Sequence, residues 1–152
     1  MDNELVQLGR QLLQTYARGD YHGVSHIAQD YLTIAERHRN SHIYGTAIHQ
    51  ANTLLGLAEL ERGQTEVAAG YLLRSARTPG SRQIKAFGPS MLLALRLLER
   101  GQRRIVVRYL KMCRSLWTLS FGTLLRWQWQ IQRGQTPNFG ANLSYLVDYK
   151  SF

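Results

Sequence analysis

The sequence predicts an all-α protein, and three observations lead to that prediction. Apolar residues recur every three or four positions through most of the 152 residues, as they do on one face of a helix. Glycine directly follows several of these apolar stretches, at the position where helices commonly end. Only three prolines occur, so few positions resist helix formation. A chain of this length normally folds as one unit, so we expect residues 1–152 to form a single domain.

Turn-forming residues bound the expected helices. Arg18-Gly19-Asp20 separates the first two, and Asn40-Ser41 supplies the expected N-cap of the long third helix. Gly63 and Gly101 end the third and fifth helices, in a left-handed conformation that glycine adopts without the penalty a Cβ imposes. Pro89 is expected at the first position of the fifth helix, where proline is tolerated. In order, the expected helices cover about 2–17, 24–38, 41–62, 67–77, 89–100, 105–117, 119–132 and 142–149.

Two segments of the chain repeat one another at an offset of 38 residues. Ala58-Glu59-Leu60-Glu61-Arg62-Gly63-Gln64 aligns with Arg96-Leu97-Leu98-Glu99-Arg100-Gly101-Gln102. A recurring helical hairpin is typical of an α-solenoid, in which each hairpin buries its apolar face against the next. We therefore expect hairpins at about 2–38, 41–78 and 87–117, followed by a capping helix and tail at 118–152.

These segments resemble the tetratricopeptide repeat family. The family's motif positions within residues 49–80 are matched by Leu55-Gly56, Gly63, Ala68 and Leu72. The second copy, residues 87–118, keeps this order but has Ala94 and Val106 where Gly and Ala are usual. The resemblance implies a right-handed stack of about three hairpins, with the first helix of each hairpin lining a concave side.

Several short sequence motifs also resemble those of uncharacterised bacterial single-domain helical proteins. This second resemblance implies the same kind of architecture and carries no information about activity. These motifs are Thr78-Pro79-Gly80-Ser81, Phe87-Gly88-Pro89, Cys113 with Trp117, and Pro137-Asn138-Phe139-Gly140-Ala141-Asn142-Leu143.

Charge is distributed unevenly along the chain. Residues 1–66 contain five Arg and eight acidic residues, whereas residues 67–133 contain thirteen Lys or Arg and a single acid, Glu99. Sixteen of the nineteen cations are Arg, which favours bidentate contact with carboxylate or phosphate groups. Such an excess of positive charge in one part of the chain indicates an acidic partner. The alternative is a solvated face that only keeps the protein soluble.

The candidate partner-binding residues come from the basic half of the chain. On the sixth expected helix, cations recur three or four positions apart, opposite the apolar residues Val106, Tyr109 and Leu110. Equivalent positions line up along a solenoid, so the cations of neighbouring hairpins are expected to join them in one strip. The candidates are Arg74, Arg77, Arg96, Arg100, Arg103, Arg104, Arg108, Lys111, Arg114 and Trp129.

The seventh expected helix allows two interpretations. Trp127 and Trp129 lie on nearly opposite faces, and the helix is apolar almost all round. Such a helix is normally buried on both sides, here between the third hairpin and the tail. The alternative is that one Trp face docks a partner or a second copy of the chain.

The residues that could carry chemistry do not form a recognisable site. His22 and His26, and likewise His38 and His42, are four apart, but no further metal ligand accompanies either pair, and the second pair straddles a loop. Cys113 lies on an apolar stripe, so we expect a buried, unreactive thiol. The sequence therefore predicts no catalytic residue, no cofactor and no metal.

The expected concave side is unusually apolar. It would carry Leu57, Leu60, Met91, Leu95 and Leu98, an exposed patch larger than a monomer normally leaves bare. One expected cover is the tail, through Phe139, Leu143, Leu146 and Phe152. The other is an amphipathic helix of a partner or of a second copy.

These features predict a non-enzymatic protein-interaction module that binds another protein with an acidic surface through its basic face. A small adaptor and an inhibitor or immunity-type protein both fit, and a nucleic-acid-binding helical repeat is the alternative. A homodimer also remains open. No run approaches about 18 apolar residues and the first residues are acidic, so we expect no membrane contact and a cytoplasmic location.

Overall fold

The computed structural model describes residues 2–147, and this part of the chain is all-helical, as expected. It contains eight α-helices and one short 3-10 helix, with no strand. None of the helices described is long and apolar enough to cross a membrane. The elements are α1 (Asp2–Ala17), α2 (Tyr21–Arg37), α3 (Tyr44–Glu61), α4 (Thr65–Ser75), α5 (Arg82–Phe87), α6 (Leu92–Leu98), α7 (Arg103–Met112), α8 (Thr123–Gln132) and the 3-10 helix η1 (Gly140–Leu143).

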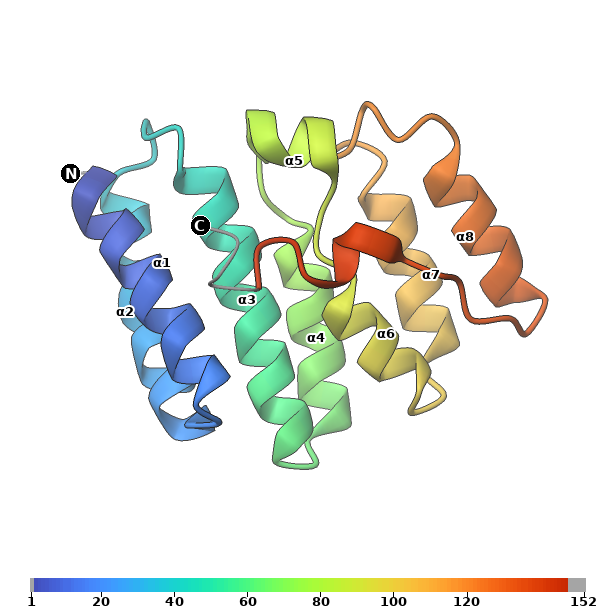
Figure 1. The fold of residues 1–152 in the computed structure, drawn as a ribbon, viewed down its shortest axis with the longest axis horizontal. Helices are drawn as coiled ribbons and strands as arrows, with labels where there is room; N and C mark the ends of the chain where they lie inside the picture. Colours follow the sequence, from blue (N-terminus) through green and yellow to red (C-terminus); the bar gives the residue numbers. More distant parts are fainter. Residues whose placement is uncertain (1, 148–152) are drawn as a thin grey trace.

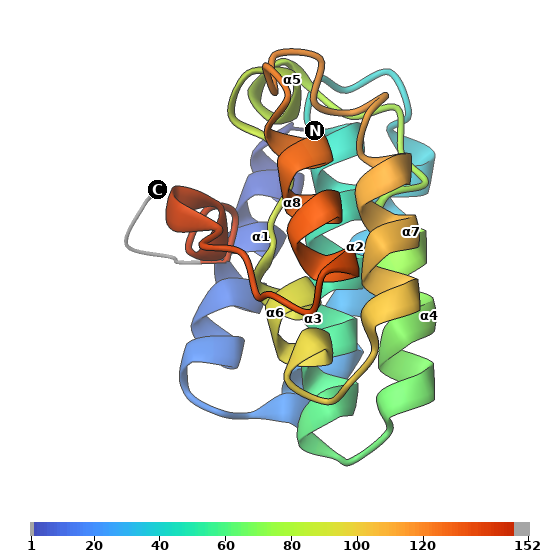
Figure 2. The ribbon, with the colours of Figure 1, turned by 90° about the vertical axis from the view of Figure 1, so that its right-hand side faces the viewer.

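Helices that are neighbours in sequence pack side by side in a row (Figure 1). α1 packs on α2, α3 on α4, and α6 on α7, while α8 packs on α7 at the end of the row. Contacts of α3 with α1, α2 and α6 join the pairs, and α4 lies beside α7 (Figure 2). One continuous core therefore runs through the whole row, from Leu5 on α1 to Ile131 on α8.

α3 lies at the centre of this core. Every residue from Gly45 to Ala58 is buried, including polar side chains, because four other helices surround α3. Buried polar groups need hydrogen-bond partners, and α3 supplies some of them from its own backbone. Asn52 Nδ2 donates to Ile48 O at 2.8 Å, and Thr53 Oγ1 donates to His49 O at 2.8 Å.

His49 is fully buried on α3 and connects three other segments. Its Nδ1 lies 2.8 Å from the backbone oxygen of Ser75 on α4, and its Nε2 accepts from the Ser90 amide at 2.9 Å. This pattern requires a neutral ring with the hydrogen on Nδ1. Burial lowers the pKa of His49 to about 4, which keeps that form. Tyr109 on α7 completes the network by donating to Ser90 O at 2.8 Å.

The segment between α4 and α6 differs from the sequence prediction. α5 occupies a stretch expected to be a loop, and it begins where the Ser81 side chain accepts from the Ile84 amide. The following helix begins at Leu92 rather than at Pro89, which is buried ahead of it. The reason is tertiary, because the carbonyl oxygens of Pro89 and Ser90 accept from Asn142 Nδ2 and the Tyr109 hydroxyl instead of from amides four residues further on.

Three other helix boundaries also differ. α3 begins at Tyr44, after an N-cap residue, Ile43, that has no capping side chain, so Asn40-Ser41 does not cap it. α7 ends at Met112, several residues early. α8 begins only at Thr123, because the two preceding residues both have positive φ angles. The last expected helix, 142–149, is replaced over its described part by η1 and turns.

The helix-ending glycines adopt the expected conformation. Gly63 has φ +79° and Gly101 has φ +78°, and the amides of these residues donate to Leu60 O and Leu98 O at 2.9 Å. Each glycine therefore ends its helix and lets the chain turn back into the next one.

The chain after α8 turns back across α3 and the segment before α6 (Figure 1). Gln50 Nε2 on α3 donates to Leu146 O at 2.9 Å, and the Met91 amide donates to Asn142 O at 2.8 Å. Phe139 and Leu146 are buried. The expected return of the tail is thus confirmed for residues 139–147, while Phe152 lies outside the described residues.

The expected groove leucines are not left bare. Leu57, Leu60 and Met91 are buried, and Leu95 and Leu98 pack partly buried against the core. As expected for an apolar patch that needs a cover, none of these five residues is exposed in the described structure.

Candidate partner-binding surface

A basic cleft lies between α7 and α8, at the end of the row of helices. It encloses about 720 Å³, and four cations line it: Arg103, Arg104, Arg108 and Lys111. Val107, which is partly buried, contributes apolar surface to the same cleft, whereas Ile131 also lines it but is buried. The cleft thus combines positive charge with a small apolar contact area.

The sequence of α7 explains why these cations face outward. Val106, Tyr109 and Leu110 are fully buried, and helical spacing places Arg104, Arg108 and Lys111 on the opposite, exposed side. The expected exposed strip on this helix is therefore present. Arg103 lies at the start of α7 and reaches the turn after α8, since a Cβ added to Gly134 would lie 2.7 Å from Arg103 Nη2.

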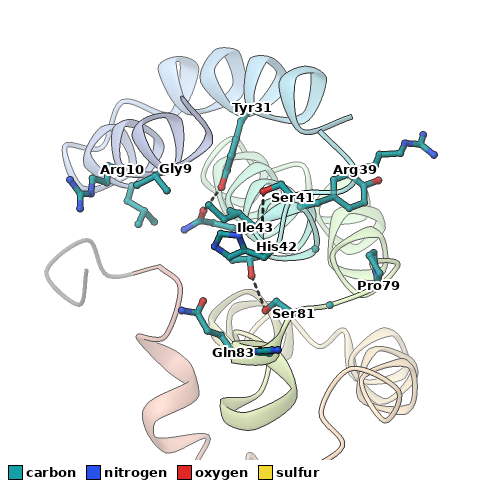
Figure 3. A pocket seen from close by; sticks show the side chains of 18 residues that line it. Gly9, Arg10, Tyr31, Arg39, Ser41, His42, Ile43, Pro79, Ser81 and Gln83 are labelled. Carbon is teal, nitrogen blue, oxygen red and sulfur yellow. Dashed lines mark hydrogen bonds between the residues drawn. The ribbon is translucent and has the colours of Figure 1, made fainter. Parts of the chain in front are cut away.

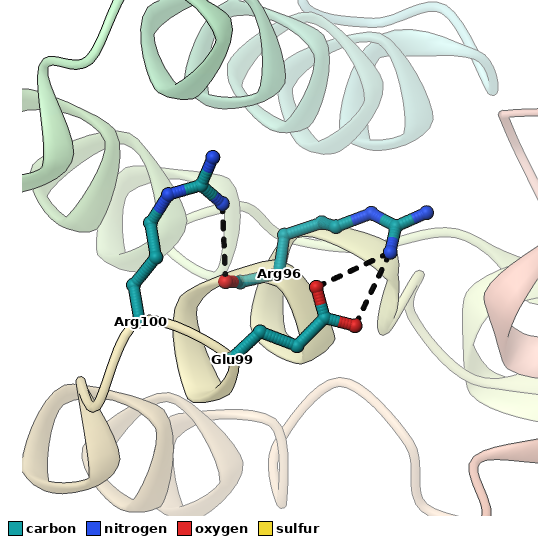
Figure 4. A network of polar contacts seen from close by, with 3 residues as sticks. All are labelled: Arg96, Glu99 and Arg100. Carbon is teal, nitrogen blue, oxygen red and sulfur yellow. Dashed lines mark hydrogen bonds and ion pairs between the residues drawn. The ribbon is translucent and has the colours of Figure 1, made fainter.

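No carboxylate neutralises this cluster within the part of the chain that the structure describes. Residues 67–147 contain one acid, Glu99, and it pairs with Arg96 on its own helix, with Nη1 3.2 Å from Oε1 (Figure 4). The four cleft cations have no ion pair among the described residues. Like charges this close repel one another, so an anion in the cleft would relieve an existing repulsion.

Two of the predicted site residues do not join the cleft. Arg96 turns to Glu99, and Arg100 Nη1 donates to the Arg96 backbone oxygen at 3.4 Å (Figure 4). Both side chains thus form their contacts at the C-terminal end of α6. Neither residue lines the cleft, and the extension of the strip to them stays a prediction.

The remaining cations flank the cleft rather than line it. Arg74 on α4 lies over the Tyr71 ring, with Cζ 5.1 Å from the ring centroid. Arg77 and Arg114 are exposed and follow α4 and α7, which pack against one another. They are therefore available to extend the positive field around the α7 cluster.

The outer face of α8 is apolar and exposed. Leu125 and Trp129 lie four positions apart on α8, with 56% and 53% of their surfaces exposed, and Phe121, 89% exposed, lies just before the helix. Arg133 lies over the Trp129 ring at 4.1 Å. Trp127, on the other side, is buried against Trp117 and Phe139. The two Trp residues thus face opposite ways as expected, but α8 is not covered on both sides.

The sequence prediction missed part of this surface. Leu125 was not singled out, although its spacing from Trp129 is that of one helix face, and the exposed Phe121 precedes the helix. The missing signal was burial, because a helix that is apolar all round looks the same whether one face is covered or not.

The other chemistry-bearing residues are placed outside this surface. Cys113 is fully buried as expected, and burial raises the pKa of its thiol, which disfavours the reactive thiolate. His22 and His26 are exposed on α2, and His38 and His42 lie on either side of the turn before α3. No group of three potential metal ligands occurs among residues 2–147.

Comparison with protein-family models, with curated proteins and with solved structures found no match to this chain.

Proposed function

We propose that this chain is a tetratricopeptide-like helical repeat protein that binds an acidic partner protein through the α7–α8 surface and catalyses no reaction. The observation that carries the proposal is the unneutralised cation cluster of the cleft, next to the exposed apolar face of α8. Adaptor and inhibitor roles both use such a surface. A cytoplasmic location fits either role.

The repeat assignment is supported by equivalent positions in the two aligned hairpins. Gly63 and Gly101 have nearly the same φ angle. The Gly56 position lies against the next hairpin, since a Cβ there would lie 2.3 Å from Leu93 Cδ2. Further pairs share complete or nearly complete burial: Ala68 with Val106, Leu72 with Leu110, and Ser75 with Cys113.

The partner chemistry follows from the two parts of the surface. Phe121, Leu125 and Trp129 offer an apolar ridge, and aromatic residues of this kind dominate many interfaces. Arg126 and Arg133 are exposed neighbours of the ridge in sequence, and the α7 cations line the cleft together with Ile131 and Gln132 of α8. An amphipathic helix with apolar residues on one face and Asp or Glu beside them complements both parts.

The direct test is charge reversal in the cleft. The Arg104→Glu/Arg108→Glu variant should lose partner capture from a native lysate by at least about tenfold, because each reversed charge repels the acidic partner. The Tm should change little, since both side chains are exposed. Quantitative mass spectrometry of captured proteins, with and without nuclease, measures the effect.

A matched control separates the cleft from net charge. Arg18→Glu/Arg37→Glu makes the same charge change at exposed positions on the other end of the molecule. This variant should retain capture. Equal loss in both variants would contradict a specific α7–α8 site, and retention of capture by the cleft variant would contradict the proposal.

The alternative is binding of nucleic acid, which the Arg-rich cleft also favours. Contacts with several phosphates release counterions, so affinity would fall steeply with salt and would be similar for unrelated sequences. Fluorescence anisotropy with two unrelated labelled oligonucleotides at two salt concentrations distinguishes the candidates. Tight binding to both oligonucleotides, abolished by the cleft variant, would replace the protein partner with nucleic acid.

A further inference from the structure

A second, larger cavity lies at the opposite end of the molecule. It encloses about 790 Å³ between α1, the turn before α3, the first turn of α3 and the segment before α5 (Figure 3). This volume is within the range of pockets that bind small molecules. It shares no lining residue with the basic cleft.

The wall of this cavity is largely apolar. Val6 and Leu13 on α1, together with Ile43, Tyr44 and Pro79, provide side-chain surface. Glycines provide much of the remaining lining of the cavity, because backbone segments approach one another at these positions. Apolar surface of this kind favours a ligand with a hydrocarbon body.

The polar groups of the cavity offer hydrogen-bond donors. Ser81 Oγ accepts from the Ile84 amide at 3.1 Å and lies 2.9 Å from Thr46 Oγ1, and since one hydroxyl donates to the other, one hydrogen of this pair has no acceptor among the described residues. The Tyr31 hydroxyl, by contrast, is satisfied by Gln50 Oε1 at 3.2 Å. A free hydroxyl donor in an apolar wall favours an acceptor group on the ligand.

Charge at the mouth of the cavity has one sign. Three arginines line it, and no acidic residue does so within the described chain. Arg39 is paired with Glu36, whereas Arg10 and Arg82 have no ion pair among the described residues. In Figure 3 Arg10 and Arg39 stand at opposite edges of the cavity, with their guanidinium groups directed outward. The uncompensated charge therefore lies at the mouth, where a ligand's anionic head would meet solvent.

We propose that this cavity binds a small monocarboxylate with a hydrocarbon tail, of the medium-chain fatty acid class. The tail lies against Val6, Ile43 and Tyr44, and the carboxylate accepts from the free hydroxyl hydrogen of the Ser81–Thr46 pair and pairs with Arg10 or Arg82 at the mouth. Long Arg side chains reach such a head group by turning about their flexible stems.

Titration calorimetry with octanoate and with 1-octanol tests the proposal on the full chain. The two probes share the same tail and differ only in the charged head. Octanoate should bind at least about tenfold more tightly than octanol, because only the carboxylate gains charge-assisted contacts. Equal affinity for the two probes, or no heat from octanoate, would overturn the proposal.

Two variants locate the site. Arg10→Gln/Arg82→Gln should weaken octanoate to the affinity of octanol and leave octanol unchanged, whereas Arg18→Gln/Arg37→Gln should alter neither. Val6→Trp, which fills the cavity from α1, should abolish binding of both probes. If Val6→Trp fails to fold, as circular dichroism would show, the two Arg variants still decide the question.

The test is independent of the proposed partner-binding surface. The Arg104→Glu/Arg108→Glu variant should bind octanoate as the unmodified chain does. Loss of octanoate binding in that variant, with binding retained in Arg10→Gln/Arg82→Gln, would place the carboxylate in the basic cleft and contradict the proposal.

Discussion

Among the glycines of the described chain, Gly45 leaves the least room for an added Cβ. A Cβ at this position would lie 1.8 Å from the carbonyl oxygen of Gly80, a backbone atom that cannot rotate away. The Gly45→Ala variant should therefore separate the start of α3 from the segment before α5 and lower the free energy of unfolding by about 2–4 kcal/mol. Urea denaturation followed by circular dichroism measures this change.

Gly70 supplies the matched control on α4. No atom lies within 4 Å of a Cβ built there, and its φ angle is helical. Gly70→Ala should raise the free energy of unfolding by about 0.5–1 kcal/mol, because alanine restricts the unfolded chain more than glycine does. If Gly45→Ala were as stable as Gly70→Ala, the close approach to Gly80 would be incorrect.

His49 makes the stability of the fold depend on pH. Its pKa in the folded chain is about 4, below the ordinary value of 6.5, so the unfolded chain binds more protons between these values. The contribution of His49 to the free energy of unfolding is therefore fully present above about pH 6.5. It is lost as the pH falls toward 4, by up to about 3 kcal/mol. Urea midpoints measured from pH 4.5 to 7.5 should show this slope.

The His49→Gln variant identifies the source of that slope. It cannot titrate in this range, so its free energy of unfolding should change less between pH 4.5 and 6.5 than that of the unmodified chain. At pH 7.5 the variant should already be less stable, because the Ser75 carbonyl and the Ser90 amide lose well-placed partners. An unchanged slope in the variant would assign the pH dependence to other groups.

At the residue scale, local patterns and distant contacts differ in how well the sequence reveals them. The burial of Cys113 and the conformations of Gly63 and Gly101 follow from spacing along one helix, and both predictions are confirmed. His49 went unrecognised because its partners lie 26 and 41 residues away in the sequence. Helical periodicity carries no information about contacts of that range.

Helices with long apolar stripes were predicted well. Short helices, and helix ends that depend on contacts with other segments, were not. α5 has six residues, too few for a periodic pattern, and it depends on the Ser81 cap. The start of α6 is set by hydrogen bonds that the carbonyls of Pro89 and Ser90 accept from Asn142 and Tyr109. These boundaries are decided by tertiary contacts that only the folded chain provides.

The glycine that ends α6 gives a test of helix termination. Gly101 is exposed and nothing lies within 4 Å of an added Cβ, so a substitution there meets only the cost of its φ angle of +78°. Gly101→Val should lower the free energy of unfolding by about 1–2 kcal/mol. Gly101→Asn should cost clearly less, because Asn tolerates this conformation, and equal losses by thermal denaturation would point to a steric cause instead.

At the scale of the whole molecule, the return of the tail ties the middle of the row to its end. Asn142 Nδ2 donates to Phe87 O and to Pro89 O, both at 3.0 Å. Asn142→Ala should lower the free energy of unfolding by about 1–3 kcal/mol, since it leaves partly buried carbonyls without partners. Ser144→Ala, an exposed neighbour, should have little effect, and equal effects of the two variants would contradict the docked position of the tail.

Only the part of the candidate surface that lies on a single helix was predictable from the sequence. The α7 cluster follows from one amphipathic helix, so the sequence revealed Arg104, Arg108 and Lys111 directly. The cleft itself depends on how α8 packs against α7, and the second cavity depends on segments far apart in sequence, including 6–13, 39–46 and 79–83. Neither arrangement has a signature in a single stretch of chain.

The hydrogen bond between Gln50 and Leu146 has a consequence for the order of folding during synthesis. These residues are 96 positions apart, so α3 cannot complete its native contacts when it first leaves the ribosome. The early helices form local pairs quickly, but part of their surface stays exposed until residues 139–147 emerge. The growing chain thus has a time window in which it is open to chaperones and to aggregation, and that window closes only when the tail docks.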